Sequence, residues 1–366
     1  MRQPSTSVSR AAALLCSAER PALLIGPEGR PARALLMRLA LLLGAELLNT
    51  PDALGDVDAE RGAGTYSFAA PPNASRVAEG TDVLLAVSGL SEFTNRLGNS
   101  FVQARIIQLT ASATDVGRNA SPVLALVGPI MENLERLERL VRAKLPTPRP
   151  RWHVPSEARG LAAPPAPRPG VIHPAAAIEA LQAALPDPAR LCLDVTSGSL
   201  HAAQRLRLRG SQRVFSSIER SACMGEAFMA SMGIRLASGV PTLALVGDWC
   251  YLMSPSELHF AVEHQLEGYV VLVWANGGGA LVGAGVEQQG IDVARRAYRW
   301  GAPPRFAKIA RALNASAIRV TDARALGRAV RRGLSSRRPL LIEACIDPDA
   351  AVPAGDRFLT LGVERR

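Results

Sequence analysis

The feature that most restricts the fold of this chain is a proline-rich stretch near its middle. Nine prolines lie between residues 145 and 174 of the 366. Proline fixes φ and lacks the backbone N–H, so this stretch favours an extended linker over a helix or a central strand. The chain is also long enough for two ordinary domains. We therefore predict one domain over residues 1–145, a linker over 146–174 and a second domain over 175–366.

Short apolar runs alternate with helical patterns on both sides of this linker. Before it, we predict strands at 21–26, 81–88, 104–109 and 122–128 and helices at 32–43 and 133–144. After it, we predict strands at 190–196, 241–248, 269–275, 317–320 and 339–346 and helices at 225–236, 255–264, 306–313 and 323–334. Such alternation is typical of parallel sheets joined by right-handed crossovers. The predicted fold class is therefore α/β, with two doubly wound parallel-sheet domains.

The charge balance does not indicate a nucleic-acid partner. Lysine and arginine number 42 and the acids 32, a formal net charge of +10. The basic residues are nearly all arginines, spread along the chain with acids between them, which is typical of solvated helix faces. Aromatic residues make up only 4% of the sequence, which leaves few platforms for base stacking. We expect no nucleic acid as a partner.

Cysteine usage and hydropathy indicate a cytoplasmic protein. The odd number of cysteines and the absence of a C-x-x-C pair fit a reducing compartment and argue against a structural zinc site. The most apolar helix candidate, residues 34–48, is interrupted by Arg38 and Glu46, so we expect no membrane span.

Two polar residues follow neighbouring strands of the second predicted domain. The strand at 241–248 ends in Gly247 and Asp248, and the strand at 269–275 is followed by Asn276 and a run of glycines. We predict that the helix between them begins with a capping box, with Ser254 at the N-cap and Glu257 at N3.

Carboxyl ends of neighbouring parallel strands meet at one edge of a sheet, so Asp248 and Asn276 are expected to lie together. A carboxylate and an amide oxygen suit Mg²⁺, whose coordination is often completed by substrate phosphates. Each residue alone is also common in a turn or a cap, and it is their joint occurrence that predicts a metal–diphosphate site.

At these residues the sequence resembles the thiamine-diphosphate-dependent enzymes of the acetolactate synthase and 2-oxoacid decarboxylase family. Gly247–Asp248 and Asn276 match the two ends of that family's cofactor motif, and residues 223–233 look like its Gly-x-Met-Gly segment. Residues 10–144 look like its Rossmann-like central domain. The resemblance implies a thiamine-diphosphate-binding second domain.

The resemblance also assigns roles to individual residues. Asp248, Asn276 and the backbone oxygen of Gly278 would bind Mg²⁺, and the backbone around Trp249 and Cys250 would meet the diphosphate. Gly225, Gly247 and Gly279 would also line the cofactor. Glu226, beside the reacting centre, is a candidate acid or base.

The sequence departs from the family pattern at three places. Trp249 stands where the family has glycine. Thr196–Ser197–Gly198 replaces the family's Gly-Gln-His, and His201 is out of register with that histidine. Glu226 replaces an apolar or aromatic residue, and a solvated carboxylate at a helix start is an equal alternative to a catalytic one.

The family's aminopyrimidine-binding domain finds no counterpart at the start of this sequence. We therefore expect a separate pyrimidine-domain subunit as the partner. The expected assembly is a hetero-oligomer, and of the possible assemblies we favour a heterotetramer. The expected small-molecule substrate is a 2-oxo acid. One alternative is a non-catalytic scaffold or regulatory subunit in which Trp249 blocks the cofactor. Another is a nucleotide or flavin site at the turn Gly26–Pro27–Glu28–Gly29.

Overall fold

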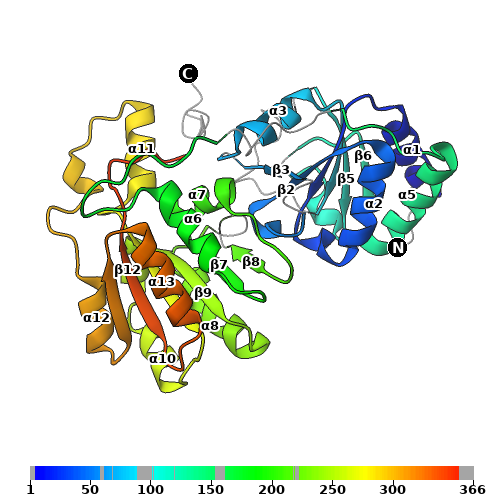
Figure 1. The fold of residues 1–366 in the computed structure, drawn as a ribbon. Helices are drawn as coiled ribbons and strands as arrows, with labels where there is room; N and C mark the ends of the chain where they lie inside the picture. The colour runs from blue at the N-terminus through cyan, green and yellow to red at the C-terminus, as the bar shows by residue number, and fades with distance from the viewer. Residues whose placement is uncertain are drawn as a thin grey trace. The chain divides into compact units, whose positions relative to one another are not determined.

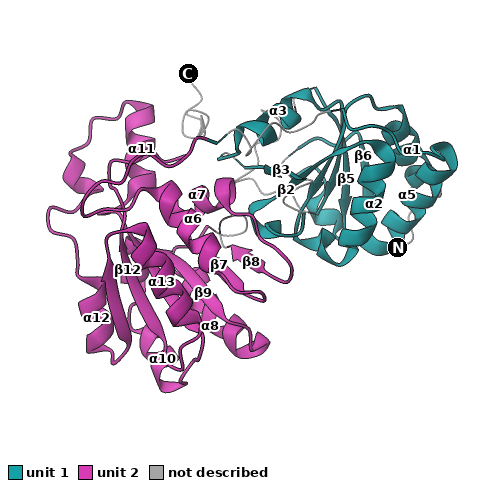
Figure 2. Cartoon of the chain, in the orientation of Figure 1, with its two compact units in different colours: residues 1–161 teal, residues 162–366 magenta. Residues whose placement is uncertain are grey.

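A six-stranded parallel sheet forms the centre of each half of the chain in the computed structural model (Figure 1). The two halves are unit 1, Met1–Leu161, and unit 2, Ala162–Arg366, which Figure 2 colours separately. The structure describes residues 5–57, 62–67, 69–88, 101, 103–118, 120–152, 161–216, 218 and 222–353. The predicted α/β class with two parallel sheets is confirmed.

Unit 1 has the strand order β3-β2-β1-β4-β5-β6. Its elements are α1 (Ser5–Ser17), β1 (Pro21–Ile25), η1 (Pro27–Ala32), α2 (Arg33–Leu43), β2 (Glu46–Asn49), η2 (Pro51–Ala53), β3 (Gly62–Thr65), α3 (Pro72–Gly80), β4 (Val83–Val87), β5 (Arg105–Thr110), η3 (Ala113–Asp115), β6 (Leu124–Val127) and α5 (Ile130–Lys144).

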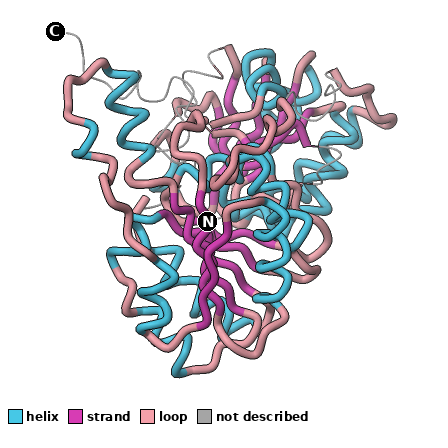
Figure 3. The backbone as a smooth tube through the Cα atoms, turned by 60° about the vertical axis from the view of Figure 1, so that its left-hand side comes forward, coloured by secondary structure: helices cyan, strands magenta, loops and turns pink. Residues whose placement is uncertain are grey.

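The strands of unit 1 are apolar because both faces of the sheet are covered. β1 and β4 are buried at every position, and alternate residues enter two different cores. Leu23 and Ile25 pack with α1, α2 and α5, whereas Ala22 and Leu24 pack with α3. Figure 3 shows the strands in the interior with helices outside them.

The two ends of the proline-rich stretch belong to different units. Trp152 Nε1 donates to the Pro21 carbonyl at 2.7 Å, and Arg149 donates to the carbonyls of Cys16 and Ala18, so this end packs on unit 1. At the other end, Ile172 forms a parallel bridge with Ile346 of unit 2. The prolines prevent a regular helix or strand, but residues between them still form hydrogen bonds with the two units. Residues 153–160 of the predicted linker lie outside the described residues.

Unit 2 has the strand order β11-β12-β10-β9-β7-β8. Its elements are α6 (Pro174–Ala184), β7 (Arg190–Leu193), α7 (Ser197–Arg205), β8 (Arg213–Ser216), α8 (Glu226–Ser238), β9 (Thr242–Gly247), α9 (Asp248–Met253), α10 (Glu257–Glu263), β10 (Tyr269–Ala275), α11 (Ala280–Gln289), η5 (Arg295–Ala297), α12 (Phe306–Ala312), β11 (Ser316–Val320), α13 (Ala323–Leu334) and β12 (Leu340–Cys345).

The order of strands in unit 2 reverses between β7 and β9. From β7 the chain proceeds outward to β8, and from β9 it proceeds the other way, to β10. One face of this sheet packs against α8, α10 and α12. Ligands of doubly wound sheets bind at the carboxyl ends of strands where the order reverses, so the ends of β7 and β9 are the place to look for a site.

The helix before β10 does not begin as predicted. The chain turns helical directly after β9, so Ser254 is the C-cap of α9, and α10 begins at Glu257 after Ser256. The capping box at Ser254 was therefore wrong: its N-cap conformation requires extended backbone, and Ser254 instead closes the preceding helix, with its N–H donating to the Tyr251 carbonyl at 3.3 Å. Among the described helices, none combines the length and apolar character needed to cross a membrane.

Candidate functional site

Three polar side chains follow adjacent strands at the reversal point of unit 2. Asp194 comes directly after β7, Asp248 after β9 and Asn276 after β10. The strand register places Asn276 within one residue of Asp248 along the sheet, because Trp274 lies opposite Gly247, and places Asp194 two residues before Asp248, because Leu193 lies opposite Leu245. All three residues are buried, with at most 7% of each exposed. The predicted pairing of Asp248 with Asn276 is extended by a second carboxylate.

Asp248 is held by backbone N–H groups from two loops. Its Oδ2 accepts from Gly278 N at 2.8 Å and its Oδ1 accepts from Trp249 N at 2.9 Å. Burial raises the pKa of Asp248 to about 7, against the lowering effect of these hydrogen bonds. Burial disfavours the ionised form of this carboxylate, and a cation close to it would strongly stabilise that form.

Asn276 and the glycine run complete one side of the site. The Asn276 Nδ2 donates to Ser197 Oγ at 3.1 Å, which leaves the amide oxygen as the atom that can bind a cation. Gly278 has φ of +136°, and a Cβ there would lie 2.3 Å from the Tyr298 carbonyl oxygen. Glycine is therefore required at 278, both for the backbone conformation and for the close approach of residues 298–300.

The Trp249 ring packs against the glycine run. A Cβ on Gly279 would lie 2.7 Å from Trp249 Cη2, so the indole occupies the space that a side chain at 279 would fill. Trp300 lies beside it, with 6.5 Å between ring centroids. The backbone N–H of Trp249, which was predicted to meet a diphosphate, donates to Asp248 Oδ1 in this structure.

Asp194 is a residue of the site that the sequence analysis did not select. Its Oδ1 accepts from Gly225 N at 2.9 Å and its Oδ2 accepts from Phe228 N at 3.2 Å, so it caps the N-terminus of α8. Burial raises the pKa of Asp194, partly offset by these hydrogen bonds. The signal was present, because Asp194 follows a buried strand as Asp248 does.

The structure places the other predicted residues around this cluster. Gly225, with φ of +87°, lies near Cys250, whose Sγ–H donates to the Val195 carbonyl at 3.1 Å. Gly247 packs against Thr196, with 3.0 Å between a Cβ built at 247 and the Thr196 Cβ. Glu226 is the first residue of α8 and is partly buried. Gly225, Gly247, Cys250 and the metal-ligand candidates thus come together.

His201 makes none of the contacts that hold this cluster together, although it lines a cavity with Asn276. It is on α7, buried, and stacked on Trp274 with 6.3 Å between ring centroids. Burial, reinforced by Arg205 and His173, lowers the pKa of His201 to about 3. A buried histidine that stays neutral and packs against neighbouring side chains has a structural role, and this is the alternative to a catalytic role for His201.

The donor set at the end of β9 and β10 fits a magnesium ion. Asp248 supplies a carboxylate, Asn276 an amide oxygen and Gly278 a carbonyl, all hard oxygen donors of the kind Mg²⁺ prefers. The Gly278 carbonyl accepts from Ala280 N at 3.0 Å in this structure and has a second lone pair for an ion. Burial raises the pKa of Asp248, and a cation bound here would favour its ionised form. These residues would hold the ion, and the ion would hold a diphosphate at the carboxyl ends of β7 and β9.

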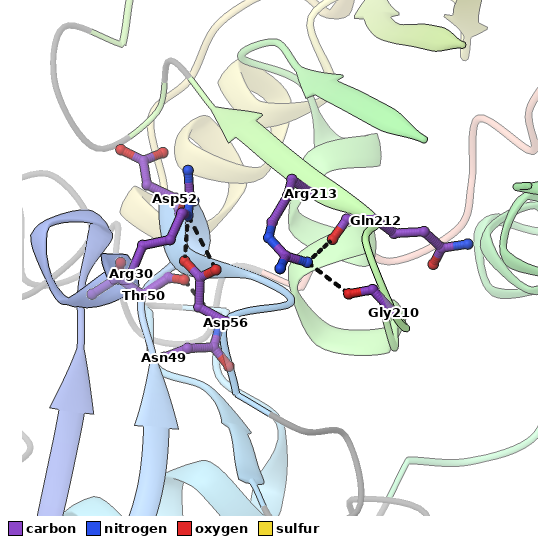
Figure 4. Close-up of polar contacts among 8 residues, drawn as sticks. All are labelled: Arg30, Asn49, Thr50, Asp52, Asp56, Gly210, Gln212 and Arg213. Carbon is purple, nitrogen blue, oxygen red and sulfur yellow. Dashed lines mark hydrogen bonds and ion pairs between the residues drawn. The ribbon is translucent and has the colours of Figure 1, made fainter. Parts of the chain in front are cut away.

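The turn after β1 in unit 1 has its own internal partners. Gly26 N donates to the Val87 carbonyl and Gly29 N to the Gly26 carbonyl. Arg30, in η1, donates through Nε to both carboxylate oxygens of the buried Asp56, at 2.8 and 3.1 Å (Figure 4). Two of the N–H groups that a phosphate would need are therefore engaged within the chain.

Comparison with known proteins extends these observations to nearly the whole chain. Residues 8–137 match the thiamine pyrophosphate enzyme central domain, and residues 194–344 match the C-terminal TPP binding domain of the same family. Thiamine pyrophosphate is another name for thiamine diphosphate. The second match contains Asp194, Asp248 and Asn276.

Curated relatives point to the same family. A Mycobacterium tuberculosis protein named "Putative acetolactate synthase large subunit IlvB2" is 29% identical over 50% of this chain and 32% of its own length. The acetolactate synthase large subunit of Parasynechococcus marenigrum is 25% identical over 72% of this chain and 43% of its own. Oxalyl-CoA decarboxylase of Escherichia coli K12 is 29% identical over 36% of this chain and 23% of its own. The chain thus spans less than half the length of each.

The two domain matches identify the cofactor as thiamine diphosphate, for which Mg²⁺ is the usual partner ion. They also agree with the two parallel sheets and with oxygen donors gathered where the strand order of unit 2 reverses. By these matches and this geometry, the chain belongs to the thiamine pyrophosphate enzyme family.

Proposed function

We propose that this chain is the central and diphosphate-binding part of a 2-oxoacid decarboxylase or carboligase of the acetolactate synthase type. The observation that carries the proposal is the convergence of Asp248, Asn276 and Gly278 within a matched TPP binding domain. The names of the relatives, acetolactate synthase and oxalyl-CoA decarboxylase, favour chemistry that breaks or forms a bond beside a carbonyl.

The residues of the chain would bind and orient rather than react. When bound, thiamine diphosphate supplies an electron sink for the decarboxylation of a 2-oxo acid. Asp248 and Asn276 would fix the ion that carries the diphosphate. Asp194 holds Gly225 and the start of α8 in place through two backbone N–H groups, which sets the position of the adjacent loop.

We further propose that the aminopyrimidine side of the site is supplied by a separate subunit, in a heterotetramer. The two matched domains, at 8–137 and 194–344, are the central and diphosphate-binding domains, which supports a complementary partner. A cytoplasmic location is part of this proposal, and the buried thiols of Cys192 and Cys250 are consistent with a reducing compartment.

The test is a turnover assay with pyruvate, Mg²⁺ and thiamine diphosphate, run on the chain alone and on the chain mixed with candidate pyrimidine-domain subunits. We expect carbon dioxide release only in a productive mixture, and its loss in Asp248→Ala. Asp322→Ala, which removes an exposed cap on α13 far along the chain, is the matched control and should keep activity. Equal turnover in Asp248→Ala and wild type would overturn the proposal.

A non-catalytic scaffold is the second candidate. The backbone N–H of Trp249 donates to Asp248 Oδ1, and the Trp249 ring covers Gly279. Both contacts favour a site that does not admit the cofactor. A scaffold would form the same complex with a partner but show no Mg²⁺-dependent binding of thiamine diphosphate. Calorimetric titration of the complex separates the two candidates.

A further inference from the structure

A cavity in unit 2 is lined by Asn276 but not by Asp248. It has a volume of about 200 Å³ and is bounded by α7, the end of β10, α11 and the segment that follows β12. Asn276, a candidate metal ligand, and its hydrogen-bond partner Ser197 line it, but Asp248, Trp249 and Gly225 do not. A volume of roughly 10–15 Å³ already holds one water, so this cavity has room for a small organic molecule.

The floor of the cavity carries a hydrogen-bond donor without an acceptor. Trp274 lines the cavity and is 1% exposed, and no acceptor among the described residues reaches its Nε1–H. The indole cannot turn away, because a Cβ on Gly198 would lie 2.7 Å from Trp274 Cδ2 and the His201 ring stacks on it. The Nε1 atom itself is buried within the protein, so Trp274 forms a fixed wall of the cavity, and its indole N–H can report on changes there.

The charges around the cavity leave one guanidinium without a carboxylate. Asp347 is paired with Arg168 at 2.7 Å, and Asp349 with Arg295 at 3.4 Å. Arg299 donates to the Pro348 carbonyl and has no carboxylate partner among the described residues. Glu287 also lines the cavity, but its side chain is exposed, so water screens its charge.

We propose that this cavity binds a small organic monocarboxylate, with its carboxylate on Arg299 and its body against the wall that Trp274 forms. A guanidinium pairs with a carboxylate through charge-assisted hydrogen bonds, which are stronger than neutral ones. Ala280, Ala284 and Ile346 supply an apolar wall for a short alkyl tail. The site needs neither thiamine diphosphate nor Mg²⁺.

The test uses propanoate as the probe and the indole N–H signal of Trp274, assigned through Trp274→Phe, as the readout. The titration is done by NMR on the whole chain without cofactor and without magnesium. We expect saturable movement of that signal with propanoate and none with propanamide, which has the same size but no charge. An unmoved signal at millimolar propanoate, or equal binding of the two probes, would overturn the proposal.

Four variants locate the charge. Arg299→Met should weaken propanoate binding by about tenfold or more, as expected for loss of a charge-assisted pair. Arg299→Lys should retain most of the affinity, which shows that the variant site is folded. Glu287→Gln and the exposed Arg324→Met should bind as tightly as wild type or tighter. Unchanged affinity in Arg299→Met would contradict the assignment of the carboxylate to Arg299.

Discussion

The ring of Trp249 fits into the space beside Gly279. A Cβ on Gly279 would approach Trp249 Cη2 to 2.7 Å, and the backbone of Gly279, with φ of −78°, is open to any L-residue. The space taken by the indole, rather than the backbone conformation, therefore explains the need for glycine at 279.

This packing predicts a strong coupling between the two positions. Gly279→Ala should lower the free energy of unfolding by about 1–3 kcal/mol in the wild-type chain, because overpacking forces the indole or the loop to move. In a Trp249→Gly background, Gly279→Ala should lower the free energy of unfolding by less than about 1 kcal/mol. Urea denaturation of the four proteins of the cycle measures the coupling. Gly301→Ala, at an open position, is the control and should cost the same in both backgrounds.

His201 predicts how stability depends on pH. Burial lowers the pKa of His201 in the folded chain to about 3, below the ordinary value of about 6.5 that applies to the unfolded chain. The unfolded chain therefore binds a proton first as the pH falls, and stability is lost below about pH 6.5. Between pH 7 and 5 this one group should cost about 2 kcal/mol.

The check is urea denaturation at both pH values in wild type and in His201→Phe, which keeps a ring against Trp274. The variant should lose less stability on acidification than wild type. His259→Gln, at an exposed histidine on α10, should behave as wild type. Parallel losses in wild type and His201→Phe would show that His201 does not titrate in this way.

Among the elements, the start of α8 depends on a carboxylate from another strand. Asp194 accepts from Gly225 N and Phe228 N, a capping arrangement in which the cap comes from the end of β7 rather than from the residue before the helix. This ties the loop at 225 to the sheet edge that carries the candidate metal ligands Asp248 and Asn276.

Asp194→Ala should lower the free energy of unfolding by about 1–2 kcal/mol and weaken Mg²⁺-dependent binding of thiamine diphosphate. Amide hydrogen exchange at residues 225–229 should become faster. Asp322→Ala removes the cap of α13 and should cost a similar amount of stability while leaving cofactor binding unchanged. Equal cofactor affinity in Asp194→Ala and wild type would mean that the cap has no part in the site.

The sequence patterns predict the central elements well because these are apolar and periodic. β1, β4, β9 and β10 lie within a residue or two of their predicted bounds, since each is a buried run ended by glycine or a polar residue. The pairing of Asp248 with Asn276 followed from the same strand ends. The position of these residues in neighbouring strands is confirmed, whereas their role as ligands stays a prediction.

Other elements depend on contacts that a single sequence does not display. β2 and β3 are four residues each, and β3 reads Gly-Ala-Gly-Thr, which carries no strand pattern. α7 and α11 are rich in glycine and serine and are held by packing against Trp274 and Tyr298. The cap from Asp194 and the fit of Trp249 on Gly279 join residues far apart in the chain, so spacing alone could not reveal them.

At the scale of the whole molecule, each unit has its own sheet and core and matches a different domain of one family. The net charge of +10 is compatible with an anionic cofactor and substrate but does not by itself identify either. The central claim therefore depends on the oxygen donors in unit 2 and on whether they hold an ion and a diphosphate.

The most direct test is calorimetric titration of the whole chain with thiamine diphosphate, with and without Mg²⁺, in wild type, Asp248→Ala and Asp322→Ala. We predict binding that requires Mg²⁺ in wild type and Asp322→Ala, and that is weakened at least about tenfold in Asp248→Ala, because the charge of the ion is then poorly compensated. Absence of binding in wild type, or binding that is indifferent to both Mg²⁺ and Asp248, would contradict the account.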